Sequence, residues 1–107
     1  MNALTPIRET YREDPALLSL RDALGAVAIA PALAYSLSRS GSHWRLRRLD
    51  ERHAQQFDSR EAALAAMRRA VVRCSAYCLF VEDWTGDFEV QSWNWDDRAA
   101  AKFGVRP

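Results

Sequence analysis

The sequence predicts a small α+β domain: a four-stranded antiparallel sheet of ββαββ order with one crossover helix, preceded by an N-terminal helix. Residues 44–47 alternate apolar and basic side chains, as a half-buried strand does. Residues 60–73 repeat small apolar side chains at helical spacing. Residues 77–81 form an uninterrupted apolar run, which is typical of a strand covered on both faces.

Length and composition are those of one globular domain. The chain has 107 residues, of which 49% are hydrophobic and 27% charged, so it can bury one core. We divide it into residues 1–42, an N-terminal arm, helix and linker, and residues 43–107, the ββαββ unit with a short C-terminal tail. Together the two parts are expected to form a single domain.

The N-terminal part contains one helix signal. Residues 1–13 are polar without a sustained period and predict a loosely held arm. Asp14 is a favourable N-cap, and Pro15 suits the first helical position because its missing N–H costs nothing there. Hydrophobic spacing predicts an amphipathic helix from Pro15 to about Ile29. The residues on its apolar face are Leu17, Leu20, Leu24, Val27 and Ala28.

The predicted helix ends or kinks at Pro31, because proline removes a backbone hydrogen bond and clashes with the preceding turn. The residues that follow Pro31 have no clear period, so their structure is left open. Residues 38–42 are small and polar with one glycine, a composition that predicts a linker.

The second part opens with two predicted strands, residues 44–49 and 53–57, joined by a charged turn. Ser59 is the expected N-cap of the crossover helix, which covers Arg60 to about Arg73. Its small inner side chains allow close packing on a sheet. The residues on this inner face are Ala63, Ala66, Met67, Ala70, Val71 and Cys74.

A hairpin and a short helix complete the predicted fold. Gly86 can take positive φ at low cost, so it predicts the turn between the strand of residues 77–81 and a second strand over 88–95. Residues 96–107 predict a short helix ended by Gly104. In the second strand one face carries Phe88, Val90 and Ser92, and the other Glu89, Gln91, Trp93 and Trp95.

The strand of residues 77–81 is apolar on both sides, and the crossover helix can cover only one face of the sheet. We therefore expect the N-terminal helix, or a second copy of the protein, to cover the other face. Four tryptophans in so short a chain also favour an exposed apolar surface. The expected partner is thus the protein itself, as a homodimer, or another protein.

Residues 43–95 resemble an uncharacterised family of small bacterial ββαββ domains, itself of unknown function. The resemblance is carried by Trp44 in the first strand, by the helix start FDSREA at residues 57–62, and by the hairpin with Gly86. It implies the ββαββ fold and assigns no functional residue. A bacterial origin agrees with the basic residues, which are all arginine except Lys102.

Four residues could in principle ligate zinc: Cys74, Cys78, His43 and His53. Structural zinc sites pair their cysteines on a turn. Here Cys74 falls on a helix face and Cys78 in an apolar strand, so we expect two buried thiols and no metal or other cofactor.

Charge is unevenly distributed along the chain. Residues 43–73 hold eight arginines against four acids, and residues 74–107 hold six acids against three bases, although the net charge is only +1. Arg45 and Arg47 share one face of a strand, and with Trp93 and Trp95 on the same side of the sheet they would form a platform for nucleic acid. The alternative is that these tryptophans pack under the N-terminal helix with arginine stems over them.

Catalytic signatures are lacking from the sequence, which has no glycine-rich phosphate loop, no His-Glu-x-x-His and no dinucleotide fingerprint. We therefore expect a non-catalytic protein-interaction or regulatory module, with nucleic-acid binding as the alternative. The longest charge-free run, residues 23–38, is shorter than the roughly 20 apolar residues of a membrane span. With only two cysteines and no secretion-signal pattern, the chain is expected to be cytoplasmic.

Overall fold

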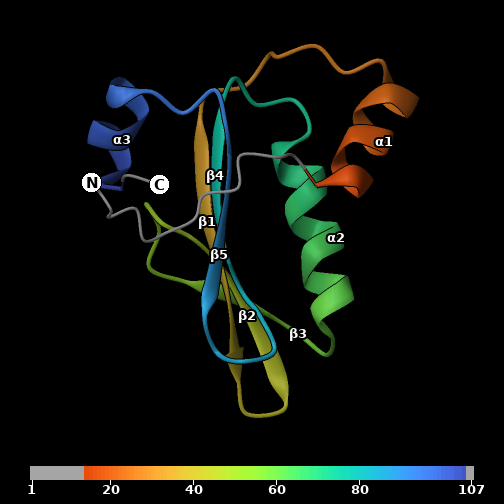
Figure 1. Cartoon of the computed structure of the whole chain (residues 1–107), viewed down its shortest axis with the longest axis vertical. Coiled ribbons are helices and arrows are strands. Elements are labelled where there is room, and N and C mark those ends of the chain that lie inside the picture. The colour runs from red at the N-terminus through yellow and green to blue at the C-terminus, as the bar shows by residue number, and fades with distance from the viewer. Residues whose placement is uncertain (1–13, 106–107) are drawn as a thin grey trace, which may run out of the picture.

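The computed structural model describes residues 14–105, which form an α+β fold (Figure 1). The arm expected at residues 1–13 lies outside the described part. None of the helices within residues 14–105 has the length and hydrophobicity needed to cross a membrane. The elements are α1 (Pro15–Leu24), β1 (Leu33–Ser40), β2 (His43–Arg48), β3 (Ala54–Phe57), α2 (Arg60–Val71), β4 (Tyr77–Glu82), β5 (Phe88–Trp93) and α3 (Asp97–Phe103).

The sheet has five strands in the order β3-β2-β1-β4-β5. Strand β1 runs parallel to β4, and the other neighbouring strands are antiparallel. The predicted α+β class is confirmed. The predicted four-stranded antiparallel sheet is wrong in detail, because an additional strand, β1, lies at its centre and makes the sheet mixed.

Strand β1 includes most of the segment that was expected to be a linker. Residues 38–40 are its end, and Gly41, at φ +62°, makes the turn to β2 with Ser42. Ser38 and Ser40 pair with Arg45 and His43 of β2, and the preceding residues 33–37 pair with β4 as well. This pairing holds the serines in a strand despite their weak preference for one.

The helices lie on two sides of the sheet (Figure 1): α1 and α2 on one, which we call the α2 side, and α3 on the other, the α3 side. The core of the α2 side joins both helices to the sheet through Leu17, Met67, Val71, Leu37, Leu46, Tyr77 and Leu79. The core of the α3 side is smaller and consists of Ala34, Cys78 and Val90, packed by Phe80, Phe103 and Val105.

The expectation that the N-terminal helix covers the other face is therefore wrong. Leu17 is fully buried in the same core as Met67 of α2. The Arg68 guanidinium donates to Asp14 at 2.8 Å, which fixes the start of α1 beside α2. The second face is covered in part by α3, which the sequence placed only as a short terminal helix.

The end of α1 also differs from the prediction. The helix stops at Leu24, because Gly25 takes a left-handed conformation at φ +55° and its N–H donates to the carbonyls of the last turn. The chain then continues extended towards β1, and Ala30 forms a parallel bridge with Cys74. Pro31 therefore follows the helix by several residues and does not terminate it.

Candidate interaction surface

The register of the sheet places Arg45 and Arg47 on the α3 side of β2. Their neighbours Trp44 and Leu46 are buried on the α2 side, so the two arginines face the opposite way. Across β1 they pair with Ser38 and Ser36. The guanidinium of Arg45 has no hydrogen-bond or ion-pair partner among residues 14–105.

Trp93 lies on the other side of the sheet from these arginines. Its ring stacks on Tyr77, with centroids 6.1 Å apart, and the Arg21 guanidinium of α1 lies 4.4 Å from its ring centroid. Trp95 comes after β5 and packs on Phe103 of α3, with ring centroids 5.7 Å apart. Trp95 therefore lies on the α3 side, the same side as Arg45 and Arg47, whereas Trp93 does not. The predicted platform is thus not formed with Trp93. For Trp93 the alternative, packing under the N-terminal helix beneath an arginine, is confirmed.

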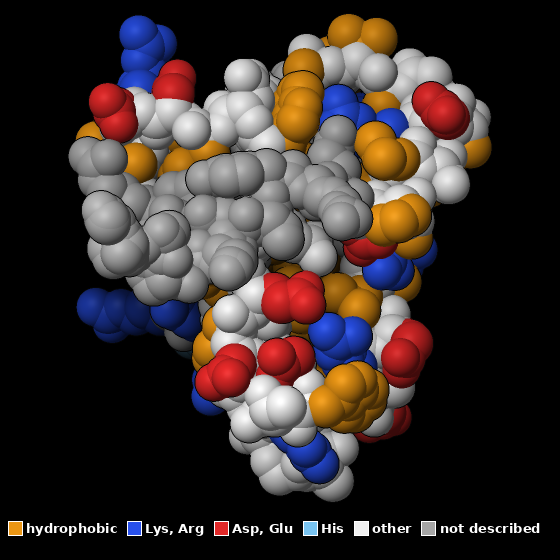
Figure 2. Space-filling model, viewed as in Figure 1, with side chains coloured by type: hydrophobic (Ala, Val, Ile, Leu, Met, Phe, Trp, Pro, Cys, Tyr) orange, Lys and Arg blue, Asp and Glu red, His pale blue; other side chains and the backbone are white. Residues whose placement is uncertain are grey.

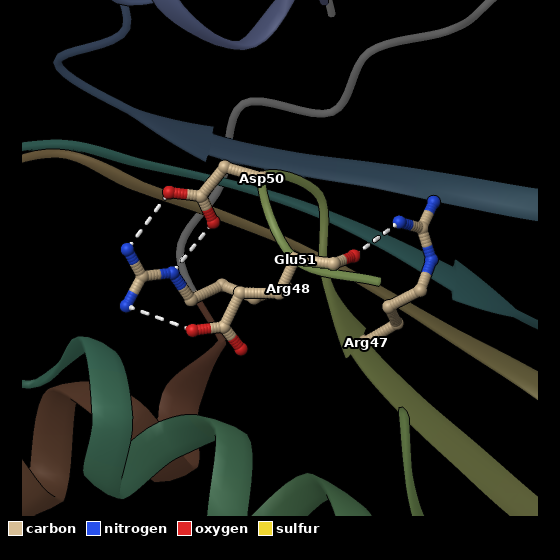
Figure 3. Close-up of polar contacts among 4 residues, drawn as sticks. All are labelled: Arg47, Arg48, Asp50 and Glu51. Atoms are coloured by element: carbon tan, nitrogen blue, oxygen red, sulfur yellow. Dashed lines mark hydrogen bonds and ion pairs between the residues drawn. The ribbon is translucent and has the colours of Figure 1, made fainter. Parts of the chain in front are cut away.

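The turn between β2 and β3 engages two arginines (Figure 3). Arg47 and Arg48 point to opposite sides of β2. Arg47 Nη1 donates to the Glu51 carbonyl at 2.8 Å. Arg48 donates two hydrogen bonds to Asp50, at 2.7 and 2.8 Å, and these hold the pKa of the Asp50 carboxyl below its usual value. Arg47 is thus part of a structured turn.

The cysteines are unbridged and buried, as predicted. Cys74 belongs to the core of the α2 side, where its thiol donates to the carbonyls of Val71 and Ala76 at 3.1 Å. Cys78 belongs to the core of the α3 side, and burial raises its pKa to about 12. Burial also raises the pKa of Cys74. Both thiols are therefore held neutral, whereas nucleophilic attack and metal ligation require thiolates.

The two histidines lie away from the thiols. His43 Nε2 is 3.7 Å from Asp58, and His53 is exposed in the β2–β3 connection. No group of three or more His, Cys, Asp or Glu side chains within residues 14–105 is arranged to hold a metal ion.

The most distinctive surface lies over α1 and the segment after it. Figure 2 shows hydrophobic side chains gathered there. Within residues 14–105, six large hydrophobic side chains are exposed, and four of them belong to residues 18–29. The six, with their exposed fractions, are Leu18 (45%), Leu24 (48%), Val27 (64%), Ile29 (73%), Trp84 (71%) and Phe88 (47%).

We call the side chains of Leu18, Leu24, Val27 and Ile29 the α1 surface. The small residues Ala16, Ala23 and Ala28 of the same segment are also exposed. The sequence prediction placed Leu24 and Val27 on the buried face of one long helix, and this is wrong. Gly25 ends the helix, so the residues beyond it no longer follow its periodicity. A glycine just past a helical run is a C-cap signal, and it could have revealed the break.

Trp84 forms a second, smaller exposed feature at the β4–β5 turn. Its ring meets Trp44 edge-on at 6.4 Å, and the Arg60 guanidinium lies 5.6 Å from its centroid. Asp83 organises the turn by accepting hydrogen bonds from the backbone N–H of Thr85 at 2.8 Å and of Asp87 at 3.1 Å. The Thr85 hydroxyl also donates to Asp83, at 2.7 Å, and this bond, together with the backbone bonds, lowers the pKa of Asp83. In Figure 1 this turn lies at the opposite end of the sheet from α1.

A cavity of about 310 Å³ lies between α3 and the starts of β1 and β4. Its polar lining includes Asp96, Arg98 and Lys102, so charges of both signs surround it. Asn94, in the left-handed region at φ +56°, borders it and donates to the Ser75 carbonyl at 3.0 Å. Ser75, Pro31 and three alanines form the rest of its wall.

No family model, curated protein or solved structure matches the chain. The resemblance of residues 43–95 to a family of bacterial ββαββ domains stays a prediction.

Proposed function

We propose that the protein is a non-catalytic interaction module that binds a protein chain through the α1 surface. The observation that carries the proposal is the clustering of exposed large apolar side chains on one helix and the segment after it. Contiguous exposed apolar patches on small proteins usually mark interaction sites. Covering such a patch gains about 25 cal/mol for each Å² of apolar surface removed from water.

The α1 surface is held in place before any partner binds. The backbone N–H groups of Ile29 and Ala30 donate to the Arg73 carbonyl at 2.9 and 3.1 Å. The N–H of Ala26 donates to the Arg21 carbonyl at 2.9 Å. A surface that is already ordered loses little conformational entropy on binding, which favours affinity.

The alternative, nucleic-acid binding, has less support. Arg45 and Arg47 lie on the side of the sheet opposite Trp93. Trp95 shares their side, but its ring packs on Phe103 of α3. Phosphate contacts weaken steeply with salt. We expect no salt-dependent retardation of short single-stranded DNA or RNA, and a shift abolished by Arg45→Ala would favour the alternative.

Site-specific photo-cross-linking in the native host tests the proposal. A benzophenone amino acid in place of Val27 should give covalent adducts with protein. The same probe in place of Gln56, an exposed residue on the edge strand β3, should not. Leu24→Glu should abolish the adduct at position 27, while the purified variant still unfolds in a cooperative thermal transition. Absence of any protein adduct at position 27 would overturn the proposed function.

A further inference from the structure

We infer that the partner bound at the α1 surface is a second copy of this chain, paired about a two-fold axis with α1 facing α1. This inference rests on the proposed function and adds the identity of the partner. A two-fold pair brings the same patch of both copies together, so the patch has to be complementary to itself.

The charged groups at the rim of the α1 surface meet this requirement. Asp22 is exposed on α1, and Arg69 is exposed on α2, which packs beside α1. Arg73 follows α2 and touches the segment of Ile29 through its carbonyl. Within residues 14–105, none of these three charged side chains has an ion-pair partner. The rim thus offers one acid and two bases, so each copy can pair its acid with an arginine of the other.

The distribution of side chains also fits a paired surface. Leu18 and Asp22 are neighbours one turn apart on α1, and both are exposed, so the surface combines apolar and charged groups as interfaces do. The exposed alanines Ala16 and Ala23 leave room for two helices to approach closely. A partner of strong opposite charge would instead need a patch of one sign, and this rim has both signs.

Sedimentation equilibrium of the purified full chain tests the inference. We expect the wild type at about 100 μM to have twice the chain mass of 12.2 kDa. Leu24→Glu should sediment as a monomer at the same concentration. Phe88→Glu is the matched control, because Phe88 is exposed to the same degree, 47% against 48%, but lies on β5. This control should remain a dimer.

A charge exchange tests the two-fold arrangement itself. Asp22→Arg should raise the dimer dissociation constant by about tenfold, and adding Arg69→Asp and Arg73→Asp should restore it. Thermal unfolding of each variant checks that it folds.

The inference fails if the wild type is monomeric, or if Phe88→Glu and not Leu24→Glu dissociates the dimer. A monomeric purified chain that still cross-links a different protein at position 27 would overturn the second copy and leave the proposed function standing. A monomeric chain without adducts would overturn both.

Discussion

The two helices on the α2 side of the sheet differ in the side chains that they expose to solvent. Helix α2 buries Ala63, Met67 and Val71 and exposes Glu61 and Arg69, as a surface helix of a globular protein does. Helix α1 buries Leu17 but exposes other leucines. On α1 these exposed leucines stand beside the exposed polar residues Ser19 and Asp22. Large apolar side chains left exposed on a helix often belong to an interface, so the proposed role of α1 predicts that its inner and outer side chains respond differently to substitution.

The largest expected effect separates the two surfaces of α1. Leu17 is 0% exposed and Leu18 is 45% exposed. Leu17→Ala should lower the free energy of unfolding by about 2–5 kcal/mol, because it leaves a cavity between helix and sheet. Leu18→Ala should lower it by less than about 0.5 kcal/mol. Urea unfolding measures both, in a Leu24→Glu background that removes self-association. Equal losses would mean that α1 has no distinct outer surface.

The second prediction concerns the access of water to the core on the α3 side, compared with the core under α1 and α2. The pKa of Cys78 is raised from 9.0 to about 12 in the folded protein. Below pH 9 the thiol is neutral in both states, so its burial stabilises fully. Above pH 9 the unfolded chain loses the proton first, and stability should fall by up to about 1.4 kcal/mol per pH unit until the folded thiol ionises.

Urea midpoints between pH 8 and pH 10.5 measure this loss. Tyr35 and Cys74, whose pKa values are also raised by burial, contribute in the same direction. The matched control is therefore Cys78→Ala, which should reduce the alkaline loss. Identical pH profiles for the variant and the wild type would show that water reaches Cys78.

The contact between the two helices gives a third, smaller effect. Asp14 caps α1 by accepting from the N–H of Ala16 at 2.9 Å, and its other oxygen accepts from Arg68. Asp14→Ala should cost about 1–2 kcal/mol, since it removes the cap and leaves the partly buried arginine unpaired. Asp22→Ala, which removes an exposed acid of the same helix, should cost less than about 0.5 kcal/mol in the Leu24→Glu background. Similar losses would contradict a specific role for Asp14.

The smallest effect compares the outer surfaces directly. Glu61→Gln on α2 should change the free energy of unfolding by less than about 0.5 kcal/mol at any protein concentration. In the wild type the midpoint should rise with protein concentration, because dimerisation stabilises the folded state by mass action. Leu24→Glu should remove that concentration dependence, and Glu61→Gln should retain it. A wild-type midpoint independent of concentration would contradict the comparison.

Elements marked by local signals could be predicted from the sequence. Ser59 caps α2 by accepting from the N–H of Ala62, and Asp96 caps α3 by accepting from the N–H of Ala99. Gly104 ends α3 in the left-handed conformation, and Gly86 takes positive φ in the β4–β5 turn. Each of these signals acts within a few residues, so a single sequence reveals it.

Strand β1 could not be predicted in the same way. On the α2 side it carries Leu33, Tyr35 and Leu37, and on the α3 side only small residues such as Ser36 and Ser38. The alternation is a strand signal, but the serine-rich end is equally typical of a linker. Pairing with β2 and with the distant β4 decides between them, and neither neighbour can be identified from these residues alone.

The sequence by itself determined the α+β class, the N-caps Asp14 and Ser59, the β4–β5 hairpin and the burial of both cysteines. Only the tertiary structure decided the order of the sheet, the side on which α1 packs and therefore which of its leucines are exposed. The physical reason is the separation along the chain of the residues that interact. Caps and turns are interactions between near neighbours, whereas α1 is placed by contacts such as Asp14 with Arg68, 54 residues apart. The same long-range packing places Arg45 and Trp93 on opposite sides of the sheet, and it leaves the side chains of the α1 surface exposed to solvent.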